Sequence, residues 1–262
     1  MKHRSFSLLG STALVNFPNG TPNSEKISFA KSVLSKNKSV KTVLEKSGNF
    51  KGRLRKQKTK FLVGINTKEV LYKENDCVFR FNVDETYFSP RLSNERKEIS
   101  SFIKKNDEVL VTFAGVAPFS IVIAKNAKAK KVYSNELNRK ANEYAKENIK
   151  RNKVEGKVEI VPGDFKKVSL KFKEKNKKFD VIVMPRPQLK ESFLREAFSL
   201  SKKGTRVYYY DFCRIEDMQN KVKMVEEEAR KARRKIKIKK VKNAGEIAPF
   251  KARIRIDFEV KN

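Results

Sequence analysis

The 262-residue chain is 39% hydrophobic, enough to bury the core of one large domain or two smaller ones. Its 62 lysines and arginines against 30 acidic residues give a net charge of +32, and this excess predicts a polyanionic partner such as nucleic acid. A single histidine and two distant cysteines, Cys77 and Cys213, argue against histidine-dependent catalysis, a metal site and a disulfide framework.

Adaptation to heat also raises the share of charged residues, but it raises both signs together. It therefore explains the excess of cations over anions less well than a polyanionic partner does. No apolar run approaches the roughly 20 residues of a membrane span, and the start lacks the apolar core of a signal peptide. With so few cysteines, these features predict a protein of the reducing cytoplasm.

The first part of the chain predicts a small, basic α+β domain. Short apolar runs separated by turn signals such as Asn19-Gly20 predict strands, and residues 28–34 have the apolar face of a helix. Six cations crowd the segment 51–61, where solvated loop positions are the alternative to a binding role. We expect residues 1–88 to bind RNA or to position a target.

The segment 87–96 joins the two parts. Pro90 keeps the preceding residue out of helical space, and Ser93 or Asn94 can cap a helix that runs to about residue 103. Glu95 falls in the first turn of this helix, where a carboxylate also complements the helix dipole.

Residues 109–125 predict a buried strand, a turn of small residues around Gly115, and a helix that begins at Pro118. This order is typical of the first unit of a doubly wound sheet, whose ligands bind at the carboxyl edge. An ordinary turn between a strand and a helix is the alternative, and the spacing does not match a dinucleotide fingerprint.

Acidic residues end the next two predicted strands. Glu136 lies 21 residues after Gly115, and the predicted strand over 158–165 ends in Gly163-Asp164. A fourth strand, 179–184, ends in a proline-rich turn. Singly, these carboxylates are ordinary turn or cap residues. Together, the order is typical of a class I S-adenosylmethionine methyltransferase, with Glu136 on the ribose and Asp164 on the adenine amino group.

The end of the chain predicts an amphipathic helix over 218–232, with a basic outer face, that packs on the sheet. Alternating apolar residues over 252–260 then predict an edge strand.

These motifs resemble the archaeal and eukaryotic tRNA guanine-37 N1-methyltransferases. The stretches that carry the resemblance are Tyr87-Phe88-Ser89-Pro90-Arg91-Leu92 with Glu95-Arg96, Phe113-Ala114-Gly115-Val116-Ala117-Pro118-Phe119, Glu136-Leu137-Asn138, Glu147-Asn148-Ile149 with Asn152-Lys153-Val154, and Gly163-Asp164. The resemblance implies an α/β fold, with a Rossmann-like methyltransferase domain over 89–262 after the small domain. It also implies that the family's N-terminal tRNA-recognition domain is absent.

By resemblance, Glu95 is the general base that removes the N1 proton of guanine, a role worth roughly 10²–10⁴-fold in rate. Arg55 matches the arginine that stabilises charge on O6 and positions the base, with a plain loop cation as the alternative. The resemblance also implies S-adenosylmethionine as cofactor, no metal, and a monomer acting on the anticodon stem-loop of phenylalanine tRNA. The implied cofactor site comprises Tyr87, Arg91, Phe113, Gly115, Glu136, Leu137, Asp164, Phe165 and Pro187.

One turn departs from the family pattern. Where the family has Asn-Leu-Pro, this chain has Pro185-Arg186-Pro187, and Pro185 has no side-chain amide to position the base. Pro185 and Arg186 are nevertheless the expected substrate-positioning residues at this turn. An archaeal branch of the family methylates C7 of 4-demethylwyosine, a larger tricyclic base, and a remodelled turn fits such a substrate. The alternatives are a methyltransferase for another RNA base, such as one in rRNA, and an RNA-binding protein with a degenerate cofactor site.

Overall fold

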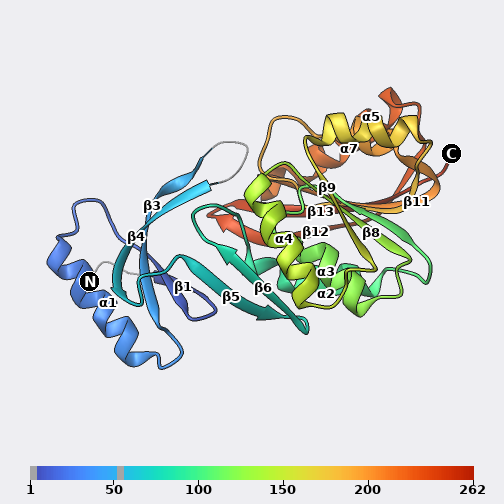
Figure 1. Cartoon of the computed structure of the whole chain (residues 1–262). Coiled ribbons are helices and arrows are strands. Elements are labelled where there is room, and N and C mark those ends of the chain that lie inside the picture. Colours follow the sequence, from blue (N-terminus) through green and yellow to red (C-terminus); the bar gives the residue numbers. More distant parts are fainter. Residues whose placement is uncertain (1–4, 52–55) are drawn as a thin grey trace. The chain divides into compact units, whose positions relative to one another are not determined.

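The computed structural model describes residues 5–51 and 56–262, and the side chains of 6–48 and 57–262 (Figure 1). It divides the chain into two compact units, Met1–Pro90 and Arg91–Asn262. The division falls after Pro90. The boundary predicted from the sequence, after residue 88, is two residues earlier. In the part of the chain described, no helix combines the length and the apolar character needed to cross a membrane.

The first unit is a small mixed sheet covered by one helix. The parallel pair β2–β3 is joined through α1, whose buried Ala30 and Val33 pack on Ala13 and Val43 of the sheet. The helix predicted over 28–34 is therefore confirmed, and it is longer than predicted. The elements are β1 (Ser5–Leu9), β2 (Thr12–Asn16), α1 (Asn23–Lys36), β3 (Thr42–Lys51), β4 (Lys56–Gly64) and the hairpin β5 (Glu69–Glu74) and β6 (Cys77–Asn82).

The second unit is built on a sheet of seven described strands in the order β12-β13-β11-β10-β7-β8-β9. The strands from β9 to β11 run parallel, and β13 lies antiparallel between β11 and β12. This is the predicted Rossmann-like arrangement. The strands are β7 (Glu108–Val111), β8 (Lys131–Glu136), β9 (Val158–Pro162), β10 (Phe179–Met184), β11 (Ser201–Arg214), β12 (Ile236–Ala248) and β13 (Lys251–Val260).

Helices cover both faces of this sheet, which is why its central strands are apolar throughout. In β7, successive residues Val109 and Leu110 face opposite sides, and both are fully buried. Helices α2, α3 and α4 lie on one face and α5, α6 and α7 on the other (Figure 1). They are α2 (Ser93–Ser101), α3 (Pro118–Asn126), α4 (Arg139–Arg151), α5 (Phe165–Glu174), α6 (Leu194–Ser199) and α7 (Met218–Lys231), with 3-10 turns η1 (Pro90–Leu92) and η2 (Ile215–Asp217).

The prediction that 252–260 forms an edge strand is wrong. Ile256 pairs with Tyr209 of β11 on one side and with Val241 of β12 on the other, so β13 is internal. Its apolar residues face the core, but the alternate residues Arg255 and Asp257 are buried as well. Apolar and charged residues do alternate along this strand, but both of its faces are buried, one among apolar side chains and the other among charged ones. The edge position belongs to β12.

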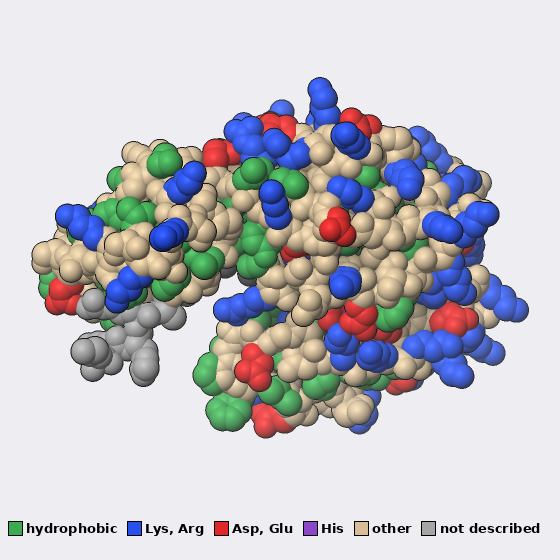
Figure 2. Space-filling model, turned by 90° about the horizontal axis from the view of Figure 1, so that it is seen from below, with side chains coloured by type: hydrophobic (Ala, Val, Ile, Leu, Met, Phe, Trp, Pro, Cys, Tyr) green, Lys and Arg blue, Asp and Glu red, His purple; other side chains and the backbone are tan. Residues whose placement is uncertain are grey.

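Basic side chains are numerous on the face of the molecule shown in Figure 2. There, lysine and arginine side chains are spread widely, with acidic side chains between them. On this face the cations are therefore not gathered at one point.

Candidate functional site

The turn between β7 and α3 has a strained backbone. Phe113, Gly115 and Ala117 have φ angles of 53°, 58° and 66°, in the left-handed region that favours glycine. The Ala114 N–H donates to the Asn135 carbonyl at 2.9 Å, which holds the turn against the end of β8. Such strain concentrates at functional sites, so the turn is the starting point of the candidate site.

Glu136, the last residue of β8, lies directly over this turn. Its Oε2 accepts from the Gly115 N–H at 2.8 Å, and its Oε1 accepts from the Asn138 N–H at 2.7 Å. Burial raises the pKa of the Glu136 carboxyl, while hydrogen bonds from the backbone of Asn138, Gly115 and Leu137 act in the opposite direction. The structure therefore joins Gly115 and Glu136 in one fixed unit, with Leu137 partly exposed beside them.

Asp164 lies at the end of the neighbouring strand and caps α5, where its Oδ1 accepts from the Lys166 N–H at 2.9 Å. The Asn135 side chain of β8 donates to the carbonyls of Val161 and Gly163 at 2.9 and 3.0 Å. These bonds tie the ends of β8 and β9 together. Asp164 therefore follows directly on a strand end that is fixed to the one carrying Glu136.

Aromatic rings form a wall of the same edge. The Phe113 ring centroid lies 6.0 Å from that of Phe165 and 5.1 Å from that of Phe193. Phe193, which precedes α6 with a φ of 60°, is absent from the predicted site. Its place depends on a backbone conformation that periodicity does not reveal.

The donors and surfaces at this edge fit S-adenosylmethionine. Carboxylates at the ends of β8 and β9 can accept from a ribose diol and an amino group, and the partly exposed Phe113 ring, backed by the buried Phe165 and Phe193, offers an apolar surface. The cofactor has no phosphate, so the lack of a phosphate-binding glycine motif is consistent with it. Among the residues that the structure describes, no cluster of histidine, cysteine or acidic side chains could hold a metal ion.

Arg186 in the turn after β10 is buried, and its guanidinium is turned inward. Nη1 pairs with the carboxylate of Asp211, and Nη2 donates to the carbonyls of Leu189 and Glu191 at 2.5 and 2.7 Å. Arg186 therefore fixes the loop that follows β10, and any effect on a substrate would act through this loop. Its neighbours Pro185 and Pro187 are both partly exposed.

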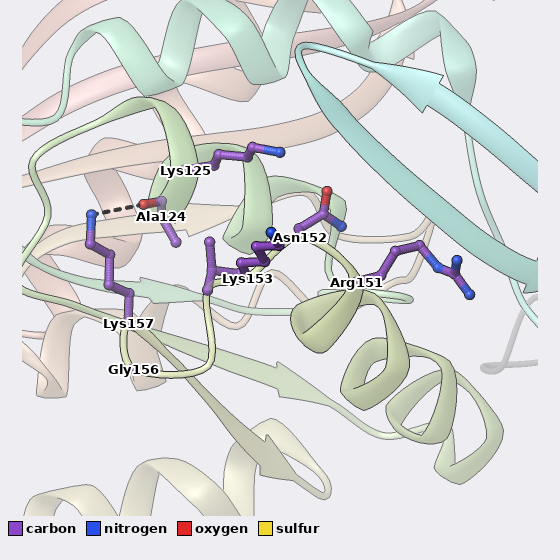
Figure 3. Close-up of a pocket in the computed structure, with 8 residues that line it drawn as sticks. Ala124, Lys125, Arg151, Asn152, Lys153, Gly156 and Lys157 are labelled. Carbon is purple, nitrogen blue, oxygen red and sulfur yellow. Dashed lines mark hydrogen bonds between the residues drawn. The ribbon is translucent and has the colours of Figure 1, made fainter.

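A basic cavity of about 600 Å³ lies at the opposite edge of the sheet (Figure 3). It is formed at the C-terminal ends of α3 and α4, with Lys125, Arg151, Lys153 and Lys157 in its lining. The Lys157 ammonium donates to the Ala124 carbonyl at 3.3 Å. Cations in the last turn of a helix complement the helix dipole, which accounts for Lys125 and Arg151 in this lining without a ligand.

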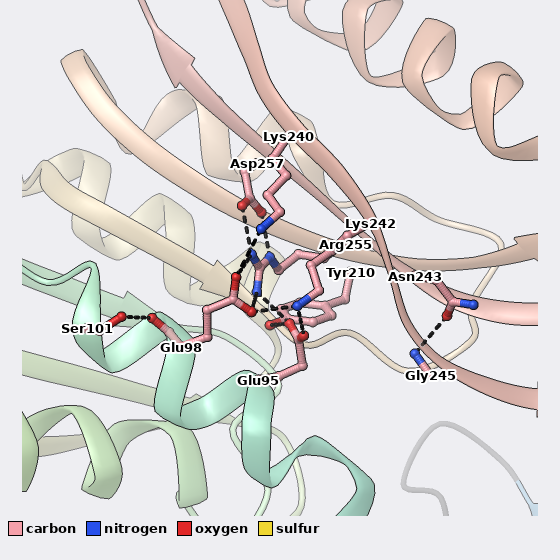
Figure 4. A network of polar contacts seen from close by, with 10 residues as sticks. All are labelled: Glu95, Glu98, Ser101, Tyr210, Lys240, Lys242, Asn243, Gly245, Arg255 and Asp257. Atoms are coloured by element: carbon pink, nitrogen blue, oxygen red, sulfur yellow. Dashed lines mark hydrogen bonds and ion pairs between the residues drawn. The ribbon is translucent and has the colours of Figure 1, made fainter.

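Glu95 is buried in the first turn of α2 and shares its carboxylate among three donors (Figure 4). Oε2 accepts from Arg255 Nη1 at 2.6 Å and from the Tyr210 hydroxyl at 2.8 Å, while Oε1 lies 2.7 Å from Lys242 Nζ. Tyr210 follows Tyr209, the residue of β11 that pairs with the last residue of β10. Glu95 is therefore held at the same carboxyl edge as the cofactor residues.

Arg255 links this carboxylate to further charges. It pairs with Glu98 Oε1 at 3.0 Å and with Asp257 Oδ1 at 2.7 Å, and Lys242 also contacts Glu98 at 2.5 Å. The hydrogen bond from Arg255 is the largest cause that lowers the pKa of Glu98 to about 2. Burial raises the pKa of Asp257. The sequence predicts a role for Glu95 but for none of these partners.

Three predicted site residues have no described contact with the residues of these clusters. Arg55 lies outside the described residues. Tyr87 belongs to the first unit and is partly exposed. Arg91 is exposed at the start of the second unit, where its Nη1 donates to the Glu246 carbonyl at 3.4 Å.

The parallel strands, the antiparallel β13 inserted beside β11, and the acidic ends of β8 and β9 define a class I S-adenosylmethionine-dependent methyltransferase domain. A family model described as the TRM5/TYW2 methyltransferase domain matches residues 70–239. The chain belongs to this family.

Similar proteins cover nearly the whole chain. The "tRNA (guanine(37)-N(1))/4-demethylwyosine(37)-methyltransferase Taw22" of Nanoarchaeum equitans is 33% identical over 97% of this chain and 98% of its own length. The crystal structure of Trm5b from Pyrococcus abyssi is 30% identical, with a TM-score of 0.86, and covers 98% of this chain and 75% of that one. A complex of aTrm5 with tRNALeu is 27% identical, also with a TM-score of 0.86, over 98% of this chain and 72% of that one.

Proposed function

We propose that this protein transfers a methyl group from S-adenosylmethionine to N1 of guanosine 37 in tRNA. The observation that carries the proposal is the buried Glu95 carboxylate, held at the carboxyl edge in a chain that matches its relatives over nearly its full length. Both the Nanoarchaeum relative and the Trm5b of Pyrococcus abyssi are named for the tRNA guanine-37 activity.

Different residues at the carboxyl edge of the sheet bind different parts of S-adenosylmethionine. Glu136 accepts hydrogen bonds from the ribose hydroxyls, and Asp164 accepts one from the adenine amino group. Phe113 and Phe165 contact the flat purine, with Leu137 and Pro187 beside it, and Arg91 at the start of the second unit contributes to the site. Tyr87, which precedes this unit, is assigned a cofactor role on the family resemblance alone. When bound, the cofactor supplies an electrophilic methyl group on sulfur.

Glu95 serves as the general base. N1 of neutral guanine carries a proton and is a poor nucleophile, so a carboxylate that accepts this proton as the N1–methyl bond forms lowers the barrier. Tyr210 and Arg255 hold Oε2, which leaves Oε1, now beside Lys242, as the oxygen that receives the proton. Arg55 stabilises the negative charge that develops on O6.

A second activity, methylation of C7 of 4-demethylwyosine at the same position, is favoured by one observation. The turn Pro185-Arg186-Pro187 lacks the family's asparagine, and Arg186 holds the following loop in a fixed conformation. Such a turn removes an amide from the base pocket and leaves two prolines there, which suits a larger ring. The relative from Nanoarchaeum has both activities in its name.

The proposed partner is tRNA, in particular the anticodon stem-loop of phenylalanine tRNA, bound by a monomer in the cytoplasm. The net charge of +32 supports a polyanionic substrate, and a solved relative is a complex with tRNALeu. The small basic unit, with Arg55, is proposed to position the target.

The test is methyl transfer from labelled S-adenosylmethionine to phenylalanine tRNA carrying either guanosine or 4-demethylwyosine at position 37. Label as 1-methylguanosine in the first form supports the main proposal, and label in both forms supports both activities. If neither form is labelled while calorimetry shows that the cofactor still binds, the proposal is overturned in favour of another RNA such as rRNA. No cofactor binding would instead favour a degenerate site.

A further inference from the structure

The hairpin between β12 and β13 ends in an exposed aromatic residue. Phe250 is 81% exposed, the highest fraction of any large hydrophobic side chain among the described residues. Ile247, on the same hairpin, is 38% exposed. We call residues 247–250 the hairpin tip. A single exposed apolar residue needs no explanation, but two of them lie within four residues on this tip, and exposed apolar side chains that cluster mark interaction sites.

The hairpin tip is held in a defined conformation. Pro249 and Phe250 join the paired residues Ala248 and Lys251, and Phe250 has a φ of 60°, which is unfavourable for a side chain of this size. The Phe250 carbonyl accepts from the Ile215 N–H at 3.1 Å, which ties the tip to the residue after β11. The exposed ring is therefore presented from a fixed backbone and not from a free loop.

The position of the hairpin tip relates it to the candidate site. Arg214, the last residue of β11, pairs with Lys251, so the tip projects beyond the carboxyl edge of the sheet. On the arm of the hairpin, the Glu246 carbonyl accepts from Arg91, and Lys242 reaches Glu95. At about 3.3 Å per residue, the tip lies on the order of 10 Å beyond Glu246.

The chemistry around the hairpin tip suits nucleic acid. Arg214 and Lys251 are exposed beside it, and the Arg253 guanidinium lies 5.1 Å from the Phe212 ring centroid. Glu216 pairs with Arg214 at 3.1 Å, and Glu246 is exposed on the arm, so the local charge is mixed. A stacking contact therefore explains the tip better than phosphate binding alone.

We propose that the hairpin tip stacks, through Phe250, on an unpaired nucleobase next to the target guanosine. Aromatic side chains bind single-stranded RNA in this way, and each stacked base contributes roughly 5- to 100-fold in affinity regardless of its identity. The inference rests on the proposed function for the identity of the RNA. It adds a contact that fixes the loop while the target base is turned into the site.

The test compares Phe250→Ala with Phe250→Tyr and with a matched control, Leu170→Ala, whose side chain is 59% exposed on α5. Binding of a fluorescent anticodon stem-loop is measured by anisotropy at fixed salt. We expect Phe250→Ala to raise Kd about 5- to 100-fold, with Phe250→Tyr and Leu170→Ala near the wild type. Cofactor affinity and the thermal midpoint should not change. Equal RNA affinity of Phe250→Ala and Leu170→Ala would overturn the inference.

Photo-crosslinking of the wild-type protein gives a second readout that needs no variant. 5-Iodouridine is placed at each loop position of the stem-loop in turn, and crosslinked peptides are sequenced. A crosslink to Phe250 from a position next to the target supports stacking, and its absence at every position argues against it. If the protein methylates guanosine 37 without these effects, only the inference fails. If Phe250 is needed for RNA binding but guanosine 37 is not methylated, only the proposed function fails.

Discussion

The carboxylate of Glu95 illustrates how a candidate base can be buried without being isolated. Its donors Tyr210 and Arg255 lie 115 and 160 residues away in sequence, on β11 and β13. A charged group left alone in this position would be costly, whereas one with three donors is stable and fixed in direction. The sequence predicts Glu95 through its motif, but no local pattern reveals such distant partners.

Substitution of Glu95 by glutamine separates proton transfer from structure. Glutamine keeps the shape but cannot accept the N1 proton, so we expect the single-turnover rate to fall about 10²–10⁴-fold. Cofactor affinity should stay within about twofold. Glu98→Gln is the matched control, because Glu98 shares Arg255 and Lys242 but not Tyr210. Equal rate losses in both variants would show that the network, not Glu95 itself, sets the rate.

Glu98 also predicts how stability depends on pH. Its pKa is lowered from the usual 4.5 to about 2, chiefly by the hydrogen bond from Arg255. Its contribution is therefore complete above about pH 4.5 and is lost as the pH falls towards 2. We expect Glu98→Gln to lower the free energy of unfolding by about 1–2 kcal/mol at pH 7, and this difference to shrink below pH 4.5. Urea unfolding at several pH values measures it, and a constant difference would contradict it.

At the scale of elements, β7 to β10, the helices α3 and α4, and α7 follow from the sequence, because their apolar residues form short runs or recur at helical spacing. The site residues at strand ends follow from this order, since parallel strands bring their carboxyl ends to one edge. Helices α5 and α6 and strands β11 and β12 are absent from the elements predicted from the sequence. Two further features do not follow. Alternation in β13 cannot distinguish solvent from the buried charges around Arg255, and the left-handed backbone of Phe193 has no residue signature.

The turn between β7 and α3 makes a prediction about glycine. Gly115 has a φ of 58°, and its N–H holds the Glu136 carboxylate. Gly115→Ala should lower the free energy of unfolding by about 1–2 kcal/mol and weaken cofactor binding severalfold, because strain shifts the N–H away from Glu136. Gly156→Ala is the control, since a Cβ there meets no atom within 4 Å. Calorimetric titration with S-adenosylmethionine compares them, and unchanged affinity in Gly115→Ala would contradict this account of the turn.

At the scale of the whole molecule, the net charge of +32 and the single ring of Phe250 act in different ways on the same RNA. Charge binds through released counterions, so affinity falls steeply with salt, whereas stacking depends only weakly on salt. The two contributions can therefore be separated in one protein without changing its charge.

We expect the affinity for the anticodon stem-loop to fall by about 10³-fold between 50 and 200 mM salt if about six phosphates are contacted. Phe250→Ala removes no charge, so its line of log Kd against log salt should lie parallel to that of the wild type. Anisotropy titrations at four salt concentrations measure both lines. A shallower slope in Phe250→Ala would mean that the hairpin tip works by placing its neighbouring cations Arg214 and Lys251 on phosphates. Parallel lines with a constant gap would mean that stacking on a base is its contribution.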